Sequence, residues 1–467
     1  MNHAHMPILH ALSEHKQKDP VSFHVPGHKN GLLASWMDLS LDMTELTGLD
    51  DLHAPEECIK EAELMLSDLH RTIESKFLVN GSTVGNLAMV LGTLSKGDTV
   101  FVQRNCHKSV LNALKMAQAF PVFLTPDFDE QTQTAGQVSK QTLIEAFKTY
   151  PESKAIIFTY PTYYGITGSL QELSAIAKSH GSLVLVDEAH GAHFGAVEKE
   201  IPMSALQLGA DLVVQSAHKM LPAMTMGAYL HINSSKIDRM RIHFYLQALQ
   251  SSSPSYPIMA SLDYARSYFA LYTQNDYLHS SRFKKRMVEL FQSNGLRCIS
   301  VDDPYKLLVR ADGLTGYELQ ASFEKAGIYV ELADPYQVLL IFPLLKAEEE
   351  LFEKRIVRKI KDLVIKTGKA APSFSEYVPV VPVSILSLPY NEHSRHEKRM
   401  VSLEEAAGQI AAEMIIPYPP GIPLIMEGEE ISNYHIQQIK WLLGQNARFH
   451  GGERLYEGKL AVFREEN

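Results

Sequence analysis

Two segments decide the fold: SLVLVDEAHG at residues 182–191 and ADLVVQSAHKM at residues 210–220, each an apolar run that ends in polar residues. Further short apolar runs lie between residues 98 and 232, namely DTVFVQ, PVFLTP, KAIIFTYP and MGAYLHI. Several of them are separated by stretches with helical spacing, namely SVLNALKMAQAF, KQTLIEAFKTY and SLQELSAIAKSHG. Strands that are apolar on both faces and alternate with helices predict an α/β fold with a mostly parallel sheet. Such sheets bind ligands at the carboxyl ends of their strands.

The rest of the chain divides into smaller parts. Helical spacing at residues 261–287 is followed by the strand-like runs YKLLVRA and QVLLIFP and by a long helical run, a pattern that predicts a second, smaller α/β domain. A Pro-, Ser- and Val-rich linker or edge segment, a helix over residues 401–415 and the rigid run PYPPGIP come last. We therefore expect an N-terminal arm at 1–45, a large domain at 46–265, a small α/β domain at 266–370 and a C-terminal α+β domain at 371–467.

The composition narrows the class of protein. Of 467 residues, 45% are hydrophobic and 21% are charged, which is typical of a globular protein. Acidic residues outnumber basic ones by 54 to 44 and no dense basic stripe occurs, which argues against nucleic acid as the main partner. No apolar run has membrane-spanning length, and the first residues do not resemble a signal peptide. The three cysteines are widely spaced, which fits a reducing compartment better than a disulfide framework. Together these features lead us to expect a cytoplasmic protein with no membrane partner.

Lys219 and Asp187 each stand at the end of an apolar run. A lysine beside Ser216 and His218 at a strand end suits a Schiff-base amine, because burial lowers its pKa. A lysine that extends to water is the alternative. A carboxylate that emerges from an apolar strand needs hydrogen bonds or a positive partner, which is either a structural ion pair or a protonated pyridine nitrogen.

Residues 78–92, LVNGSTVGNLAMVLG, place Gly81, Ser82 and Thr83 at the start of a predicted helix. Free backbone N–H groups, hydroxyls and the helix dipole at such a position bind phosphate. An ordinary N-cap is the alternative. The string DEAH at residues 187–190 also occurs in helicases, but the chain has no GxxxxGK[ST] phosphate loop, so this interpretation fails.

Order and spacing join these signals into one hypothesis. A phosphate-binding helix start, a strand-end aspartate and a strand-end lysine 32 positions later are the groups that pyridoxal 5'-phosphate requires in a doubly wound sheet. Gly81, Ser82 and Thr83 would hold the phosphate, and Asp187 would keep the ring nitrogen protonated. Lys219 would bind the aldehyde carbon covalently. His107, in the NCHKS turn after DTVFVQ, would stack on the open face of the ring.

The chain resembles the ornithine/lysine/arginine decarboxylases of pyridoxal-phosphate fold type I, the aspartate aminotransferase-like fold. The shared segments follow the order of that family: FHVPGHKNG, TELTGLDDLH, LVNGSTVGN, NCHKS, TYPTYYG, VDEAHG, QSAHK, SSSPSY and PYPPGIP. The chain begins close to the PGH segment, so it is similar to the short form without the receiver-like wing domain, and we do not expect a decamer. Residues 426–429, Met-Glu-Gly-Glu, depart from the Pro-Gly-Glu turn that is common in the family.

The resemblance implies a role for each matched residue. Lys219 would bind the cofactor, Asp187 would pair with its pyridine nitrogen and His107 would stack on its ring. His190 would lie near the phenolic oxygen. The predicted phosphate contacts are Ser82, Thr83, Ser216 and His218.

Three further segments complete the predicted site. Ser251, Ser252 and Ser253 would reach the cofactor of a neighbouring subunit, since the family places its site between two subunits. The segment from His24 through Val25, Pro26 and Gly27 to His28 matches the N-terminal active-site segment, and we assign His24 and His28 to substrate binding. Glu405, in VSLEEAAG, is the candidate for the distal cation of the substrate, with a solvated helix face as the alternative.

The implied reaction is decarboxylation of a basic amino acid to a primary amine in polyamine biosynthesis, with Lys219 or His218 supplying the proton. Arginine giving agmatine is preferred, and lysine giving cadaverine or ornithine giving putrescine are alternatives. An aminotransferase or aldolase is a rival, although no small-domain arginine for the α-carboxylate is identified. A non-enzymatic binding protein is a second rival, and it would have little reason to keep Lys219, Asp187 and His107 together. We expect a homodimer or a dimer of dimers with its active site at the subunit interface, and no metal.

Overall fold

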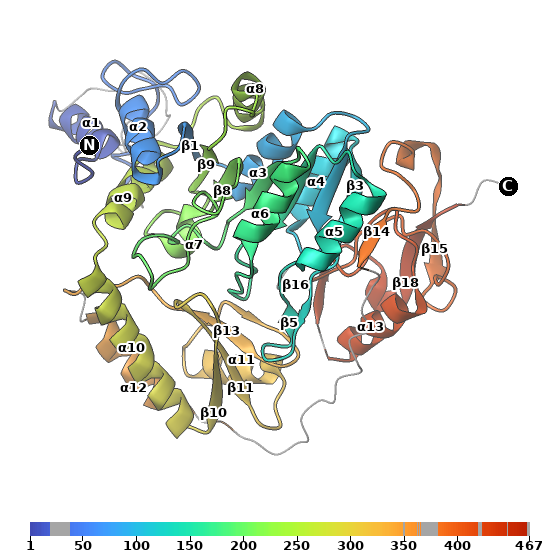
Figure 1. Ribbon diagram of the computed structural model, residues 1–467. Helices are drawn as coiled ribbons and strands as arrows, with labels where there is room; N and C mark the ends of the chain where they lie inside the picture. Colours follow the sequence, from blue (N-terminus) through green and yellow to red (C-terminus); the bar gives the residue numbers. More distant parts are fainter. Residues whose placement is uncertain are drawn as a thin grey trace. The chain divides into compact units, whose positions relative to one another are not determined.

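The computed structural model describes residues 1–18, 38–348, 351–361, 363, 365, 382–418, 423–445 and 447–464. The chain forms two compact units (Figure 1). Unit 1 comprises residues 1–94 and 183–273, and unit 2 comprises residues 95–182 and 274–467. Both units combine strands and helices, so the α/β prediction is confirmed, whereas the four domain boundaries stay a prediction. No helix in the described part of the chain is both long enough and apolar enough to cross a membrane.

Unit 1 contains four strands and six helices among its described residues. The strands are β1 (Glu74–Leu78), β7 (Leu183–Asp187), β8 (Leu212–Gln215) and β9 (Ala228–Ile232). The helices are α1 (Pro7–Gln17), α2 (Cys58–His70), α3 (Gly81–Thr93), α7 (Ala217–Met220), α8 (Arg239–Leu249) and α9 (Tyr256–Ala270).

The strands of unit 1 lie in the order β1-β9-β8-β7. β7 and β8 are parallel, as predicted, whereas β9 runs antiparallel to both β8 and β1. A parallel partner needs a crossover of a dozen or more residues that usually includes a helix long enough to cover the sheet. Residues 216–227 form only the four-residue α7, so the chain returns antiparallel. The carboxyl ends of β7 and β8 therefore lie at the same edge.

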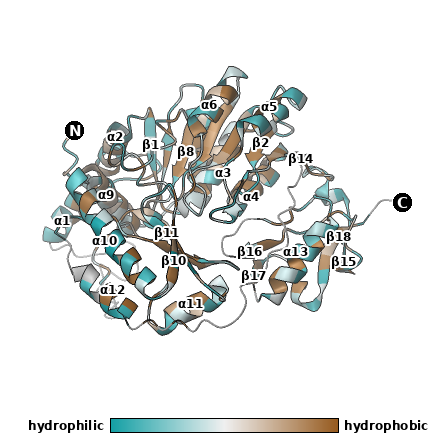
Figure 2. Cartoon of the chain, turned by 60° about the horizontal axis from the view of Figure 1, so that its bottom comes forward, coloured by the Kyte–Doolittle hydropathy of each residue, from teal (hydrophilic) through white to brown (hydrophobic). Residues whose placement is uncertain are grey.

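Helix α3 covers one face of this sheet beside β8 and β9 (Figure 1). All residues of β8 are buried, and its ribbon is brown in the hydropathy view (Figure 2). α3 approaches β8 closely at Gly85, where an added Cβ would lie 2.5 Å from Val214 Cγ1 and 2.8 Å from Leu78 Cδ1. The missing side chain of Gly85 therefore determines how near the start of α3 lies to the strand ends.

Unit 2 holds the remaining strands and helices of the described chain. Its first half contains β2 (Thr99–Gln103), α4 (Lys108–Ala117), β3 (Phe120–Leu124), β4 (Phe128–Asp129), β5 (Thr134–Ala135), α5 (Lys140–Thr149), β6 (Ala155–Thr159) and α6 (Leu170–Ser179). Its second half begins with α10 (Gln274–Ser293), β10 (Leu296–Ser300), β11 (Lys306–Ala311), α11 (Gly316–Lys325), β12 (Leu332–Ala333), β13 (Val338–Ile341) and α12 (Leu351–Lys361). It ends with β14 (Val383–Ile385), β15 (Lys398–Ser402), β16 (Ile416–Tyr418), α13 (Asn433–Gly444), β17 (Arg448–His450) and β18 (Lys459–Phe463).

Besides the short antiparallel pair β4–β5, three groups of strands organise the described part of unit 2. β6, β2 and β3 are parallel neighbours, and β14 pairs antiparallel with β3. The antiparallel sheet β10-β11-β13-β12 lies beside the helices α10 and α12 (Figure 1), as predicted for a smaller α/β part. The C-terminal α+β part pairs β15 with β18 and β16 with β17, and it contains α13.

The predicted helix over residues 401–415 is wrong. This segment forms the end of β15, turns and isolated bridges, including Ala411 to Val462 and Ile415 to Ile425. Gly408 has φ +82°, a left-handed conformation that interrupts a helix. The apolar residues with helical spacing instead enter the C-terminal core, where Ala411 and Ile415 are fully buried.

We predict that Gly85→Ala lowers the free energy of unfolding by about 1–3 kcal/mol, because the added methyl group overpacks the contact with Val214 and Leu78. Urea unfolding followed by circular dichroism measures this loss. Gly444→Ala is the matched control, since a methyl group at the end of α13 meets no atom within 4 Å. Equal stability of the two variants would show that the α3–β8 contact relaxes freely.

Candidate active site

Asp187 is the last residue of β7 and is only 2% exposed. Its Oδ2 accepts a hydrogen bond of 2.8 Å from Asn86 Nδ2 of α3, and its Oδ1 accepts one of 3.1 Å from the backbone N–H of Ala189. No lysine, arginine or histidine forms an ion pair with it among the described residues. Two neutral donors compensate a buried charge only in part, so this carboxylate is suited to a cationic ligand atom.

Lys219 lies on α7, immediately after the end of β8, and is half-buried. Its Nζ is 3.1 Å from Nε2 of His190, which is 5% exposed. Because an ammonium group only donates hydrogen bonds, His190 Nε2 accepts this one when Lys219 is charged. The chain thus places an amine, an imidazole and the Asp187 carboxylate at the ends of neighbouring parallel strands.

The start of α3 forms the predicted phosphate turn. Gly81 adopts φ +74°, and its N–H donates to Met226 O at 2.8 Å. The side chain of the N-cap residue Asn80 makes no capping hydrogen bond, so it does not occupy the N–H groups of the first turn. Ser216 Oγ donates to Ser82 Oγ at 2.7 Å, so hydroxyls from the end of β8 and from the first turn of α3 converge there. Positive helix dipole and convergent hydroxyls suit a phosphate group.

The other residues of unit 1 that are predicted to contact the cofactor differ in their exposure to solvent. Thr83 is exposed on the first turn of α3. His218 is half-buried, and its Nδ1 donates to Gly227 O at 3.0 Å, which leaves Nε2 as the acceptor of a neutral ring. The loop after α8 carries three exposed serines, Ser251, Ser252 and Ser253.

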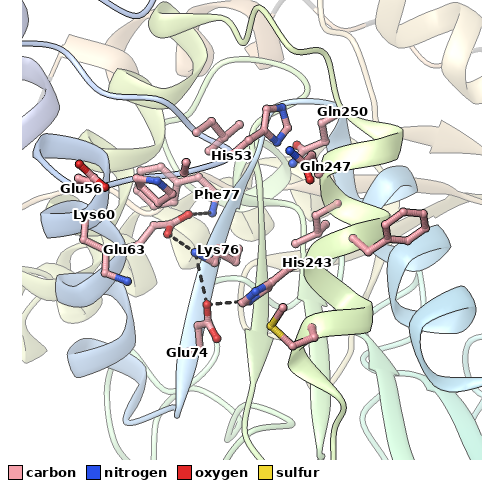
Figure 3. A pocket seen from close by; sticks show the side chains of 16 residues that line it. His53, Glu56, Lys60, Glu63, Glu74, Lys76, Phe77, His243, Gln247 and Gln250 are labelled. Atoms are coloured by element: carbon pink, nitrogen blue, oxygen red, sulfur yellow. Dashed lines mark hydrogen bonds and ion pairs between the residues drawn. The ribbon is translucent and has the colours of Figure 1, made fainter. Parts of the chain in front are cut away.

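A pocket of about 550 Å³ lies between α2, β1 and α8 (Figure 3). Two of its lining residues form hydrogen bonds with backbone atoms next to the predicted site. Gln250 Oε1 accepts the backbone N–H of Val79 at 2.9 Å, next to the phosphate turn, and His53 Nε2 lies 2.8 Å from Ser251 O. The pocket wall therefore supports both the turn that begins α3 and the serine loop.

A row of charged side chains crosses the same pocket (Figure 3). Lys76 Nζ lies 2.8 Å from Glu63 Oε2 and 3.3 Å from Glu74 Oε1, and His243 Nε2 lies 2.9 Å from Glu74 Oε1. Burial by itself raises the pKa of Glu74, but the hydrogen bonds and charges of His243 and Lys76 outweigh it and lower the pKa to about 2. This carboxylate is therefore ionised throughout the neutral and mildly acidic range.

His107 belongs to unit 2, where it is the exposed N-cap of α4. Its Nδ1 accepts the N–H of Ser109 at 3.2 Å. Two acidic residues of the 426–429 segment flank the same region: Glu429 accepts from Arg104 at 2.8 Å, and Glu427 accepts from Lys115 at 2.6 Å. The segment that departs from the family turn therefore contacts both sides of His107 along the chain.

Two groups of predicted substrate contacts remain predictions. Glu405 is exposed in unit 2, where its Oε2 accepts from Ser402 Oγ at 2.9 Å. His24 and His28 lie outside the described residues, as does part of PYPPGIP.

Sequence reasoning missed two residues that matter here: Asn86 and Gln250. Asn86 gave the clearest signal, since a single amide within an otherwise apolar helical pattern calls for a buried partner.

Fold and chemistry together define a class, the pyridoxal-phosphate-dependent enzymes of fold type I. Within it, the chain belongs to the Orn/Lys/Arg decarboxylase family. The model of the major domain of Orn/Lys/Arg decarboxylases matches residues 6–301, and the model of the C-terminal domain matches residues 380–459. The chain is therefore a pyridoxal-phosphate-dependent decarboxylase whose substrate is a small basic amino acid, and these predictions are confirmed.

Similar proteins place the chain within this family. An uncharacterised Bacillus subtilis protein, YaaO, is 46% identical and covers 98% of this chain and 99% of its own length. An arginine decarboxylase of Bacillus subtilis is 30% identical, with 94% of each protein covered. The structure of the constitutive lysine decarboxylase of Escherichia coli matches with a TM-score of 0.78 at 18% identity, covering 99% of this chain and 82% of that chain, which shows the shared fold.

We predict that Glu74→Gln flattens the acid limb of the stability profile. The pKa of Glu74 is lower in the folded protein than its usual value of 4.5, so its contribution to stability is present above that value and is lost as the pH falls toward 2. Between about pH 5 and about pH 3 the wild type should lose about 1 kcal/mol more free energy of unfolding than the variant. Urea unfolding at each pH measures this difference. Glu56→Gln, an exposed carboxylate of the same pocket, is the control, and equal slopes for all three proteins would contradict the assignment.

Proposed function

We propose that this enzyme decarboxylates L-arginine to agmatine and carbon dioxide, with Lys219, Asp187 and His190 at its catalytic centre. The observation that carries the proposal is the buried Asp187 carboxylate, whose hydrogen-bond donors in the described part of the chain are the neutral groups of Asn86 and Ala189. Arginine is favoured over lysine because the arginine decarboxylase of Bacillus subtilis shares 30% identity over most of both chains. Lysine and ornithine are the alternative substrates.

The residues of unit 1 fit pyridoxal phosphate by their donor chemistry. Bound pyridoxal phosphate supplies an electron sink for the electron pair that carbon dioxide leaves behind. Asp187 keeps the ring nitrogen protonated, because its buried charge stabilises a cation and Asn86 holds its carboxylate in place. The N–H groups at the start of α3, with the hydroxyls of Ser82 and Ser216, hold the phosphate.

In this proposal, Lys219 and His190 transfer the proton to the carbon that has lost carbon dioxide. With Nζ 3.1 Å from His190 Nε2, Lys219 exchanges a proton with the imidazole without a rearrangement of the backbone. With the cofactor and substrate bound, the ammonium form of Lys219 would deliver the proton that completes the product, and His190 would return a proton to the amine. His218, oriented by Gly227 O, is the second candidate for this transfer. His107 would stack on the cofactor ring.

The proposed enzyme works as a homodimer or dimer of dimers in the cytoplasm. Ser251, Ser252 and Ser253 are exposed at the end of α8, where they are accessible to a neighbouring subunit. The orientation of their loop is supported by Ser251 O, which lies 2.8 Å from His53 Nε2. Cys58 and Cys298 are thiols outside any disulfide, in keeping with a reducing compartment.

An amine product profile tests the proposal. Cofactor-loaded protein is given an equimolar mixture of arginine, lysine and ornithine, and amines, keto acids and carbon dioxide are measured. We expect agmatine and carbon dioxide from the wild type, none from Lys219→Ala, and roughly a hundredfold lower kcat in Asp187→Asn, since the stabilising charge is lost. Cadaverine or putrescine as the main product would change the substrate, and keto-acid formation without carbon dioxide would overturn the reaction.

We further predict that Glu405→Gln raises KM for the cationic substrate roughly tenfold with little change in kcat, because one charge-assisted contact is removed. Glu404→Gln is the matched control, since the neighbouring carboxylate pairs with Lys440 at 2.7 Å. Steady-state kinetics of the three proteins measure the effect. An unchanged KM in Glu405→Gln removes Glu405 from the substrate site.

A further inference from the structure

A second buried carboxyl directly follows Asp187, and the proposed reaction does not use it. Glu188 is fully buried. Its Oε1 accepts the backbone N–H of Ala205 at 2.6 Å, and its Oε2 accepts from Ser204 Oγ at 2.9 Å and from Gln215 Nε2 at 2.7 Å. Every partner donates to the carboxyl, so it is held from three directions.

These bonds continue across the sheet as a row of polar groups, all of them buried except the half-buried Thr72 at the far end. Gln215 Oε1 accepts from His231 Nε2 at 3.1 Å, because the amide nitrogen of Gln215 already donates to Glu188. His231 Nδ1 then accepts from Ser75 Oγ at 2.8 Å, and Ser75 bonds Thr72 Oγ1 at 2.7 Å. The row passes from the end of β7 over β8 and β9 to β1. Burying polar side chains costs desolvation free energy, and a network whose hydrogen bonds are satisfied makes the surrounding structure rigid.

The row lies on the face of the sheet opposite α3. Asp187 pairs in register with Val214, whose side chain is next to Gly85 of α3, and Asn86 of α3 donates to Asp187. Gln215 follows Val214, and Glu188 follows Asp187, so both side chains point to the other face. The backbone of Asp187 and Glu188 is thus held on one face by Asn86 and on the other by Ser204, Ala205 and Gln215.

The backbone adds one more constraint. The N–H of Glu188 donates to Val214 O at 2.8 Å, and the N–H of Gly191 donates to Glu188 O at 2.9 Å. A backbone rotation that turns Asp187 away from α3 would have to break bonds on both faces of the sheet. The same segment ends two residues later at His190, which contacts Lys219.

We propose that Glu188 is a positioning residue that fixes the Asp187 carboxylate on the α3 side of the sheet and thereby sets the proton affinity of the bound cofactor ring. This inference rests on the proposed role of Asp187. Burial raises the pKa of Glu188 to about 8 against the lowering effect of its hydrogen bonds from Ala205, Gln215 and Ser204. The two oxygens of the ionised form only accept hydrogen bonds, whereas protonation brings an O–H hydrogen among the three donors.

The test uses Glu188→Gln in the full chain, because glutamine keeps the size of the side chain but brings an NH2 group among three donors. Pyridoxal phosphate is titrated into the cofactor-free protein, and the visible absorption of the loaded protein is followed against pH. We expect the dissociation constant of the cofactor to rise roughly tenfold, which is typical when a residue that orients a ligand-binding side chain is replaced. The pH midpoint of the absorption change should shift as well. Ser204→Ala removes a single bond and should shift both readouts in the same direction, so it carries the test if Glu188→Gln does not fold.

Asp211→Asn is the matched control. Asp211 is a buried carboxylate that accepts the backbone N–H of Val184 at 2.8 Å, at the opposite end of the same strand pair. This variant should lower the melting temperature but keep the cofactor affinity and the pH midpoint of the wild type.

Asp187→Asn separates the two proposals. If it changes both readouts while Glu188→Gln and Ser204→Ala match the wild type, the positioning role is overturned and the role of Asp187 stands. If Asp187→Asn also matches the wild type, the proposed function of Asp187 fails. Equal shifts in Glu188→Gln and Asp211→Asn would show a general loss of stability and would equally overturn the positioning role.

Discussion

A buried negative charge without a cationic partner among the described residues is the constraint on which the rest of unit 1 depends. Asp187 stands at the end of β7 and is 2% exposed. A carboxylate in such a place loses its hydration, and two neutral hydrogen bonds restore only part of it. In the proposed function, the chain tolerates this cost because the cation of the bound ligand completes the compensation. In that proposal, the buried carboxylate lowers the stability of the ligand-free protein and strengthens the binding of a ligand that carries a cation.

Helix α3 shows how fold and site depend on the same contacts. Gly85 lets the helix approach β8, Asn86 on the next position reaches Asp187, and the uncapped first turn faces the hydroxyl of Ser216. A shift of α3 would therefore change the packing, the aspartate and the phosphate turn together. The wall of the pocket in Figure 3 opposes such a shift, because Gln250 fixes the backbone just before the turn.

Much of this site could be predicted because parallel strands expose their carboxyl ends at one edge. The strand that ends in Asp187 and the strand that ends four residues before Lys219 are both visible as apolar runs. Residues 401–415 were mispredicted for a related reason: helical spacing of apolar residues also arises when turns and short bridges fold around a core, and Gly408 is the only local sign of it. The direction of β9 depends on the length of a connection, and periodicity does not show it. Glu188 stood beside Asp187 in the DEAH string, yet a sequence pattern does not tell which face of the sheet each acid points to until the neighbouring partner, Gln215, is in place.

In the C-terminal part of unit 2, buried carboxylates are compensated by basic side chains. Arg104, three residues before His107, pairs with Glu429 at 2.8 Å, and both side chains are largely buried. Glu427 binds both Lys115 and Lys398, and although burial raises its pKa, the hydrogen bonds from His393 and these lysines lower it to about 2. Removing one partner of such a pair leaves a buried charge uncompensated, which costs more than the pair itself contributes. The acidic residues that replace the common family turn therefore tie the C-terminal part to both ends of the segment that carries His107, and this makes the C-terminal part a support for that histidine rather than an appendage.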